Sequence, residues 1–243
     1  MSHLDWTSRT ELLLGSEKLD MLKNAHVLVV GLGGVGAYAA ESVCRAGVGK
    51  MTIVDGDVVN PSNLNRQLIA LNSTIGQSKS DILAKRLMDI NPDLKLDVRN
   101  VFLRDEETIK LLDADHYDYI VDAIDTLSPK VYLLYHALQK GYKVVSSMGA
   151  GGKTDPTKIQ VSDISKSSVC RLARTVRKRL GKMGIRKGIT VVFSTEEAAE
   201  HAIIGSSEEQ NKNSTVGTIS YMPAVFGCFV ASVVIRDLTN MIK

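Results

Sequence analysis

The residues best suited to chemistry begin with glycines at G-x-G-x-x-G spacing, where an apolar run over residues 27–30 meets a helical pattern. The candidate phosphate-binding residues are Gly31, Gly33, Gly34 and Gly36. Gly31 permits a tight turn, Gly33 lets the backbone approach a phosphate, and Gly36 lets the helix pack against the strand. Because free N–H groups and the helix dipole favour an anion, the motif predicts a nucleotide phosphate, of either NAD or ATP.

Polar residues that can contact the rest of a nucleotide follow the glycines. Asp55 ends a second apolar run, residues 50–54, at a place where a carboxylate can accept both ribose hydroxyls. The turn-forming stretch that comes next contains Asp57 and delivers Asn63 and Arg66 near the same strand ends. A nicotinamide dehydrogenase has no evident use for Asn63 and Arg66.

A lysine and two acids extend this set. Lys79 lies in the first turn of the helix expected over residues 80–90, where its charge opposes the helix dipole. Anion binding is therefore favoured over a solvated surface charge. Asp122 and Asp125 follow the strand expected over residues 119–121, at the edge where open α/β sheets bind ligands. One of these acids can hold Mg²⁺ with phosphate oxygens, while Asp122 can equally cap the next helix.

Together these residues describe a site that binds a nucleotide and also carries cations and a metal-binding acid. Hydride transfer does not require those cations. Attack of a carboxylate on the α-phosphate of ATP does, because negative charge accumulates on the phosphoryl oxygens and on the pyrophosphate leaving group. The sequence therefore predicts adenylation of a carboxylate.

Alternating strand and helix patterns must position these residues. Strands are expected over residues 27–30, 50–54, 94–98, 119–121, 143–146, 159–163 and 189–193. Helices are expected over residues 7–24 with a break at Gly15, 37–46, 80–90, 106–112, 128–141, 171–183 and 223–241. This order predicts an α/β fold: a Rossmann-like, doubly wound, mostly parallel sheet with helices on both faces. We expect one domain, 1–243, with a nucleotide-binding half, 1–150, and a substrate-binding half, 151–243.

Length and composition limit the class of protein. The chain has 243 residues, 44% of them hydrophobic, and a formal net charge of +3, so any nucleic-acid surface must come from clustered charge. Cys44, Cys170 and Cys228 are odd in number and far apart, which argues for a reducing compartment and against a disulfide framework or a four-cysteine zinc site.

Targeting segments are not evident in the sequence. The N-terminus lacks a signal-peptide pattern, so we expect a cytoplasmic location. The longest apolar run, residues 222–235, is shorter than the ~20 residues that span a bilayer. We therefore expect a buried helix there and no transmembrane segment.

Positive charge is concentrated in the second half of the chain. Residues 164–195 contain nine Lys or Arg residues and no acid. On a helix, Arg171, Arg174 and Lys178 share one face, which favours binding of a nucleic-acid backbone over a solvated helix face or a contact with an acidic partner. The polar residues 194–218 that follow are expected to form a long mobile loop.

Several stretches resemble the ThiF/MoeB-like adenylating enzymes, which are related to ubiquitin-activating proteins. The resemblance rests on residues 31–36, 47–49, 55–57, 63–67, 76–79, 90–92 and 122–125, which occur in the family's order. It implies that Asp55 binds the ribose of ATP and that Asp125 binds Mg²⁺. The implied phosphate-handling residues are Asn63, Arg66 and Lys79.

The same resemblance implies a homodimer. Arg9 is similar to the arginine that this family inserts from the second subunit, although the arginine that usually precedes it is absent. A catalytic set of Arg9, Arg66, Lys79 and Asp125 follows from the resemblance.

Within this family, residues 149–161, residues 192–196 and the basic helix resemble the tRNA threonylcarbamoyladenosine dehydratases. The implied substrate is the carboxylate of a threonylcarbamoyl group on an adenosine beside the tRNA anticodon, which ATP activates and which then cyclises. The implied anticodon stem-loop contacts are the loop over residues 194–218 and the basic helix, through Arg171, Arg174, Arg177 and Lys178.

Other interpretations stay open. ThiF and MoeB proteins typically carry paired C-x-x-C zinc ligands, and their absence here disfavours zinc and the main alternative, an activator of a ubiquitin-like sulfur carrier. A nicotinamide-dependent oxidoreductase and a non-catalytic nucleotide-binding regulator are further alternatives. The sequence leaves open a monovalent cation and a sulfur-transfer partner protein. Cys170, with basic neighbours, is expected to be more reactive than Cys228 in the apolar helix.

Overall fold

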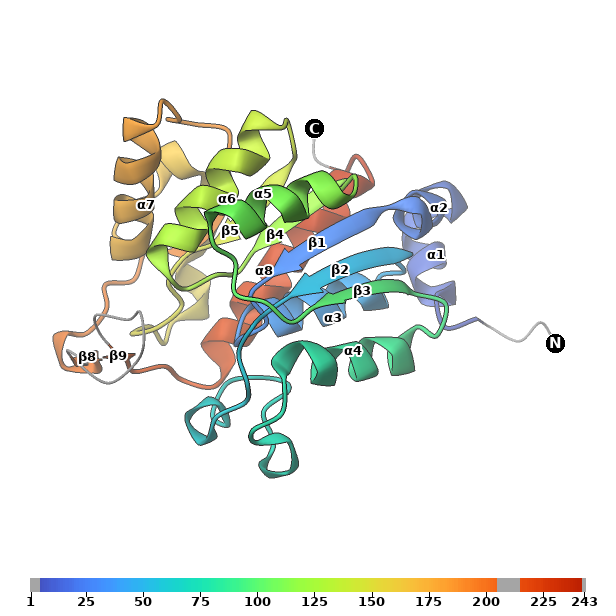
Figure 1. Ribbon diagram of the computed structural model, residues 1–243, viewed down its shortest axis with the longest axis horizontal. Helices are drawn as coiled ribbons and strands as arrows, with labels where there is room; N and C mark the ends of the chain where they lie inside the picture. The colour runs from blue at the N-terminus through green and yellow to red at the C-terminus, as the bar shows by residue number, and fades with distance from the viewer. Residues whose placement is uncertain (1–4, 205–214, 242–243) are drawn as a thin grey trace.

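One seven-stranded sheet, in the order β3-β2-β1-β4-β5-β7-β6, forms the centre of the protein in a computed structural model that describes residues 5–204 and 215–241 (Figure 1). Neighbouring strands are parallel except for β6 and β7. The strands are β1 (His26–Val30), β2 (Lys50–Val54), β3 (Lys95–Arg99), β4 (Tyr119–Asp122), β5 (Val144–Ser147), β6 (Ile159–Asp163) and β7 (Thr190–Ser194). A separate antiparallel pair consists of β8 (Ile203–Ile204) and β9 (Thr215–Val216).

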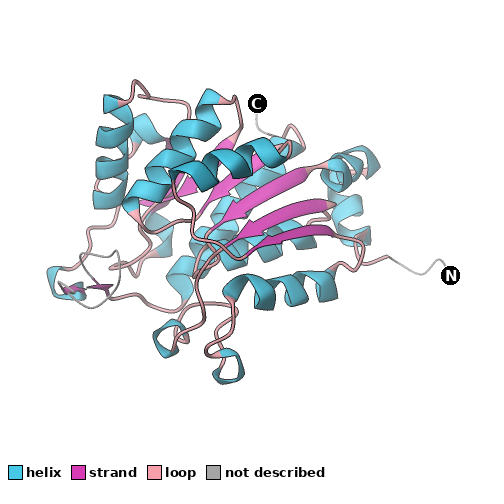
Figure 2. Ribbon diagram, in the orientation of Figure 1, coloured by secondary structure: helices cyan, strands magenta, loops and turns pink. Residues whose placement is uncertain are grey.

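Helices cover both faces of this sheet (Figure 2). One hydrophobic core joins α3, α4 and α8 to one face, and a second joins α5, α6 and α7 to the other. The α-helices are α1 (Ser8–Leu14), α2 (Ser16–Asn24), α3 (Gly36–Arg45), α4 (Lys79–Ile90), α5 (Asp105–Ala114), α6 (Leu127–Gln139), α7 (Arg171–Lys182) and α8 (Tyr221–Leu238). Short 3-10 helices are η1 (Pro61–Asn63), η2 (Asn72–Thr74), η3 (Pro156–Lys158), η4 (Ile164–Lys166) and η5 (Glu200–Ala202).

The central strand β1 shows why both faces need helices. All five of its residues are buried, as in parallel sheets that are covered on both sides. Because side chains alternate along a strand, Val27 and Val29 enter the first core while Leu28 and Val30 enter the second. The predicted doubly wound α/β fold is confirmed.

The direction of winding reverses beside β1. This strand pairs in parallel with β2 on one side and with β4 on the other. The loops that leave the carboxyl ends of β1 and β4 therefore run to opposite faces of the sheet and leave a crevice between them, which is the usual ligand site of an open α/β sheet. Gly31, Gly33, Gly34 and Asp125 lie on the loops at this edge, whereas Asp122 is the last residue of β4.

The N-terminal helices confirm the break predicted at Gly15, where φ is 87°. Leu19 and Leu22 of α2 are buried, but α1 has no buried residue. Leu12 and Leu13 of α1 are 83% and 82% exposed. Leu14 packs against the first core, but the described part of this chain leaves Leu12 and Leu13 uncovered.

The stretch over residues 194–218 differs from the single loop that the sequence predicts. It contains η5 and the β8–β9 pair, because Ile203 and Ile204 pair with Val216 and Thr215. The polar run over residues 205–214 lies outside the described residues.

Helix α8 has the length and composition of a membrane-spanning segment. Its packing gives another reason for that composition. Its buried residues are Met222, Pro223, Phe226, Gly227, Val230, Ala231, Val233 and Val234, and they fill the core beside α3. Burial within the fold thus explains the apolar run, as predicted.

Candidate active site

The glycine turn (residues 31–36) connects β1 to α3. Gly31 has φ of 87°, which side-chain-bearing residues rarely adopt. A Cβ on Gly36 would lie 1.7 Å from the Gly31 carbonyl oxygen, so the helix can approach the strand only without one. At Gly33 the nearest atom to such a Cβ is Gln67 Nε2 at 3.6 Å, which leaves this backbone open toward the crevice. The turn therefore has the form of a phosphate-binding loop.

Asp55 stands at the end of β2 and is tied to this turn. Its Oδ2 accepts the N–H of Leu32 at 2.6 Å, and its Oδ1 accepts the N–H of Asp57 at 2.8 Å. Burial raises the pKa of this carboxyl, and the positive charge of Lys79 and the two N–H bonds oppose that rise. The carboxylate is held in one orientation at the switch point, with lone pairs left for ribose hydroxyls.

Lys79 begins α4 and is buried, with 5% of its surface exposed. Its Nζ lies 3.0 Å from Asp57 Oδ2, so the two predicted nucleotide-binding residues form an ion pair. The sequence did not predict this pairing. It keeps a buried ammonium group in place beside the glycine turn, because an unpaired charge would be too costly to bury.

The loop between Asp55 and α4 carries the other two residues that the sequence predicts for nucleotide binding, Asn63 and Arg66. Asn63 is buried, and its Oδ1 accepts the N–H of Asn60 at 3.0 Å, which closes η1. Arg66 is half-buried, and its Nη1 donates to Ser62 O at 2.7 Å and to Asn65 Oδ1 at 2.9 Å. These bonds orient the guanidinium, while the Arg66 carbonyl lies near Gly34.

Two further residues at this edge were not predicted from the sequence. Gln67 is buried beside the glycine turn, and its Oε1 has no hydrogen-bond partner among the described residues. A buried acceptor without a partner indicates that a ligand or water completes it. The ring of Phe102, 64% exposed, lies against Gly56 next to Asp55. The only available signal for Phe102 was its position just after the third strand.

The two acids after β4 have different surroundings. Asp122 is completely buried and forms an ion pair with the equally buried Lys130, with 2.7 Å between Oδ2 and Nζ. Asp122 is therefore part of the core, and its possible roles as a metal ligand or helix cap are not supported. Asp125 is exposed on the turn before α6, at the edge that also carries the glycine turn. It remains the candidate Mg²⁺ ligand.

Arg9 lies away from this edge within its own chain. It lines an apolar hollow together with Ile235 and Arg236 near the end of α8. The glycine turn instead packs against the start of that helix, where a Cβ on Gly34 would lie 2.9 Å from Pro223 Cβ. The intervening helix is on the order of 20 Å long.

Helix α7 presents most of its cations to solvent. Arg171, Arg174 and Lys178 are exposed, while Val176 and Leu180 are buried in the second core. Arg177 differs from the prediction, because it is half-buried and its Nη1 donates to Ser167 O at 2.7 Å and to Ser167 Oγ at 2.6 Å. Its guanidinium holds the segment before α7, so we remove Arg177 from the proposed tRNA contacts.

The cysteines also require a correction. Cys170 is buried, whereas Cys228 is exposed, and neither forms a disulfide. The expectation that Cys170 is the more reactive thiol rested on basic neighbours in the sequence. Access favours Cys228, because it lies on the outer side of α8.

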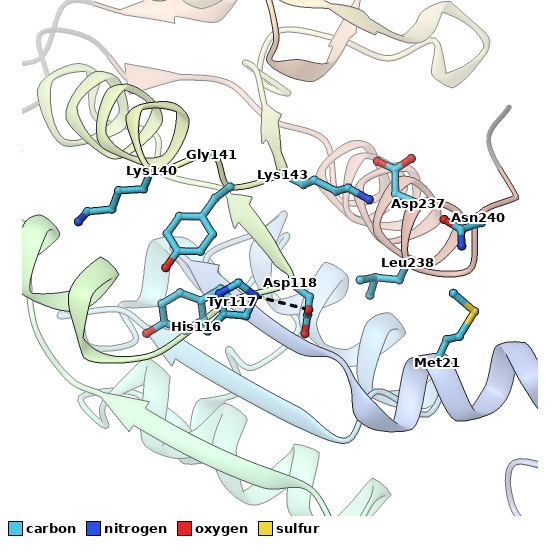
Figure 3. A pocket seen from close by; sticks show the side chains of 11 residues that line it. Met21, His116, Tyr117, Asp118, Lys140, Gly141, Lys143, Asp237, Leu238 and Asn240 are labelled. Atoms are coloured by element: carbon cyan, nitrogen blue, oxygen red, sulfur yellow. Dashed lines mark ion pairs between the residues drawn. The ribbon is translucent and has the colours of Figure 1, made fainter.

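A cavity of about 460 Å³ lies at the opposite edge of the sheet (Figure 3). Its lining includes His116 and Asp118 before β4 and Lys143 before β5. None of the predicted site residues lines this cavity. Its lining contains both acidic and basic side chains, so it does not favour a ligand of one charge. We therefore place the active site at the carboxyl edge, on the basis of chemistry rather than of hollow volume.

The fold and site define a nucleotide-binding α/β protein with a phosphate-binding turn at the switch point of the sheet and a buried cation beside it. The chain belongs to the ThiF family, which matches residues 7–242. It is 40% identical to the tRNA threonylcarbamoyladenosine dehydratase of Bacillus subtilis (strain 168), covering 97% of this chain and 95% of that protein.

Solved structures agree with this family assignment. The Escherichia coli tRNA N6-threonylcarbamoyladenosine dehydratase in complex with ATP superimposes with a TM-score of 0.87 at 32% identity, covering 97% of this chain and 94% of that one. The same Escherichia coli protein in complex with AMP gives a TM-score of 0.86 at 33% identity, with 96% and 93% covered. The resemblance drawn from the sequence is confirmed.

Proposed function

We propose that this chain is an ATP-dependent tRNA threonylcarbamoyladenosine dehydratase, which converts N6-threonylcarbamoyladenosine in tRNA to its cyclic form through an acyl adenylate. The observation that carries the proposal is the meeting of the glycine turn, Asp55 and the buried Lys79 at one sheet edge. Near-complete coverage of relatives with this activity supports the choice of substrate.

The site suits ATP with a divalent cation. The glycine turn would hold the phosphates through backbone N–H groups, and Asp55 would hold the ribose. Among the described residues, no group of three or more His, Cys, Asp or Glu side chains is arranged to hold a metal ion. A single carboxylate, Asp125, fits Mg²⁺, which is usually held by one or two carboxylates and by the substrate's phosphates. The ion would supply neutralisation of phosphate charge.

In the first step, the substrate carboxylate attacks the α-phosphorus of ATP, and pyrophosphate leaves. Lys79, held by Asp57, and Arg66, held by Ser62, would stabilise the charge that develops on the phosphoryl oxygens. In the second step, the neighbouring carbamoyl oxygen attacks the activated carbonyl and AMP leaves. The ring closes with net loss of one water, and proximity of the reacting groups supplies much of the rate.

The tRNA would lie along α7. Arg171, Arg174 and Lys178 are exposed together, and residues 164–195 contain no acid to neutralise them. Contacts of lysine and arginine with phosphates orient a nucleic acid without reading its sequence. The anticodon stem-loop is therefore expected between α7 and the carboxyl edge of the sheet.

A homodimer would complete the site. Arg9 is distant from the glycine turn of its own chain, and the exposed Leu12 and Leu13 beside it offer an apolar contact surface. A second copy that covers α1 would bury these leucines and insert Arg9 beside the partner's ATP. The three thiols without disulfides suit a cytoplasmic location.

The proposal is tested by incubating the protein with ATP, Mg²⁺ and tRNA that carries threonylcarbamoyladenosine, and analysing the tRNA nucleosides by mass. The expected result is a nucleoside lighter by one water, with AMP and pyrophosphate formed. Unmodified tRNA is the control. AMP and pyrophosphate formed only with a ubiquitin-like carrier protein would refute the proposal in favour of a sulfur-carrier activator.

A further inference from the structure

A fully buried ion pair lies directly behind the turn that carries Asp125. Lys130, in the first turns of α6, and Asp122, the last residue of β4, both have side chains that are 0% exposed. Lys130 Nζ lies 2.7 Å from Asp122 Oδ2, and Ser146 Oγ of the neighbouring strand donates to the same oxygen at 2.6 Å. The function proposed above gives no task to this pair.

The pair holds the backbone of Ile124, the residue that precedes Asp125, at both its N–H and its carbonyl. The N–H of Ile124 donates to Asp122 Oδ1 at 3.1 Å. The carbonyl of Ile124 accepts from Lys130 Nζ at 2.9 Å. A strand end and a helix start are thus joined to one residue of the intervening turn, whose path is fixed by charge-assisted hydrogen bonds.

The same turn is pressed against the glycine turn. The N–H of Ala123 donates to Val30 O at 2.9 Å, and a Cβ on Gly31 would lie 2.8 Å from Ala123 O. A shift of the Ile124 backbone would therefore change the separation between Asp125 and the glycine turn.

Stability alone does not account for these charges. Removing two charges from water costs much of what their attraction returns, and apolar residues of similar volume often fill such a space equally well. Apolar side chains cannot bond the N–H and the carbonyl of Ile124 simultaneously. We propose that Lys130, together with Asp122, is a positioning residue that fixes the backbone of Ile124 and so aims Asp125 at the metal-bound phosphates of ATP.

This inference rests on the proposed function, because it takes Asp125 as the Mg²⁺ ligand. Residues that orient a ligand without touching the metal typically change metal affinity or activity 10–100-fold when replaced. Loss of Lys130 should act on metal affinity and kcat, and should leave the binding of ATP itself nearly unchanged.

The test uses variants of the full-length protein. Lys130→Met alone leaves the Asp122 carboxylate buried beside an apolar chain and can prevent folding. The combined variant Asp122→Asn with Lys130→Met removes both charges and keeps the space filled. Leu133→Ala is the matched control, because Leu133 is equally buried in α6 and makes none of these hydrogen bonds. Asp125→Asn reports on the metal ligand itself.

Three quantities are measured: Mn²⁺ affinity in the presence of a non-hydrolysable ATP analogue, by electron paramagnetic resonance; kcat and KM for ATP; and the exchange rate of the Ile124 amide. We expect the combined variant to weaken Mn²⁺ binding by about 10–100-fold and to lower kcat. Its KM for ATP should stay within about twofold, and the Ile124 amide should exchange faster. Leu133→Ala should lower only the melting temperature.

Two results would overturn the inference, and they are distinguishable. If the combined variant matches Leu133→Ala in Mn²⁺ affinity and kcat while Asp125→Asn weakens Mn²⁺ binding, the pair is structural and the proposed function stands. If Asp125→Asn leaves Mn²⁺ affinity unchanged, the metal role of Asp125 fails and the inference fails with it.

Discussion

At the scale of single residues, the buried Lys79 has the most direct consequence for chemistry. Only 5% of it is exposed, and Asp57 is its ion-pair partner at 3.0 Å. A charge held away from water interacts more strongly with a developing charge than a solvated one does. The ion pair also fixes the lysine before ATP binds, so no rearrangement is needed during the reaction.

Replacing this lysine should therefore affect the reaction more than the binding of ATP. We expect Lys79→Ala to lower the rate of pyrophosphate release on the order of 10²–10³-fold, the usual effect of removing one preorganised charge donor. Lys85→Ala is the control, because Lys85 is an exposed lysine of the same helix. Equal rates for the two variants, measured by coupled detection of pyrophosphate, would remove Lys79 from the catalytic set.

At the scale of elements, α7 combines a buried apolar side with an exposed cationic one. Ala173, Val176 and Leu180 enter the second core, and this anchors the helix. Its charges are thus held on a rigid surface rather than on a loop. Replacing the exposed cations should therefore affect tRNA binding, whereas replacing the half-buried Arg177 should affect stability.

Neutralising the exposed set should weaken tRNA binding. We expect the slope of log Kd against the logarithm of salt concentration to fall by about two in the triple variant Arg171→Gln, Arg174→Gln and Lys178→Gln. The KM for ATP should stay unchanged. Filter binding at several salt concentrations measures this slope. Arg177→Gln is the control and should instead lower stability by about 1–3 kcal/mol, because Arg177 bonds Ser167. Unchanged tRNA affinity of the triple variant would make the exposed side of α7 an ordinary solvated surface.

The loop after β5 depends on one carboxylate. Glu196 accepts the N–H groups of Thr154 and Asp155 at 2.9–3.0 Å. Burial opposes ionisation, but these hydrogen bonds outweigh it and lower the pKa of Glu196 below its ordinary 4.5. The stabilisation is therefore complete above the ordinary glutamate pKa and is lost as the pH falls through the lowered value.

At pH 7, we expect Glu196→Gln to lower the free energy of unfolding by about 1 kcal/mol. The variant should therefore melt at a lower temperature than the unmodified protein. The difference should shrink as the pH falls below 4.5, where the unmodified carboxylate also becomes protonated. Thermal unfolding across a pH series measures both effects. A constant difference at all pH values would show that charge is not the cause.

At the scale of the whole molecule, the exposed Leu12 and Leu13 of α1 and the distance of Arg9 from the glycine turn support the proposed homodimer. Arg9 lies beside the end of α8, and the glycine turn lies beside its start. A monomer cannot bring them together without unfolding the core that separates them. In the proposed homodimer, the second copy covers α1, and Arg9 of each chain enters the site of the other.

Mixing inactive variants tests that arrangement. Arg9→Ala and Lys79→Ala should each be nearly inactive alone. In a random mixture, half of the dimers pair the two variants and each such dimer has one intact site, so about a quarter of the unmodified activity should return. Recovery is measured as AMP formation after mixing and reassembly. Exchange of subunits without recovered activity would place Arg9 outside the partner's site.

Much of this protein was predictable because its determinants are local. The helix break at Gly15 depends on the conformational freedom of one residue. A buried parallel strand such as β1 can be recognised in the sequence as a short run of apolar residues. The glycine turn, Asp55 and Lys79 were identified from residue type and spacing, since the doubly wound fold brings successive strand ends to one edge.

Tertiary structure decided which charges are buried together and which surfaces stay uncovered. The Asp57–Lys79 and Asp122–Lys130 pairs, and the anchoring role of Arg177, depend on distances between separate elements that no local pattern encodes. The sequence by itself determined the fold class and the kind of site. Only the folded chain separated Asp125, which is exposed, from Asp122, which lies in the core, because burial depends on the packing of residues far apart in sequence.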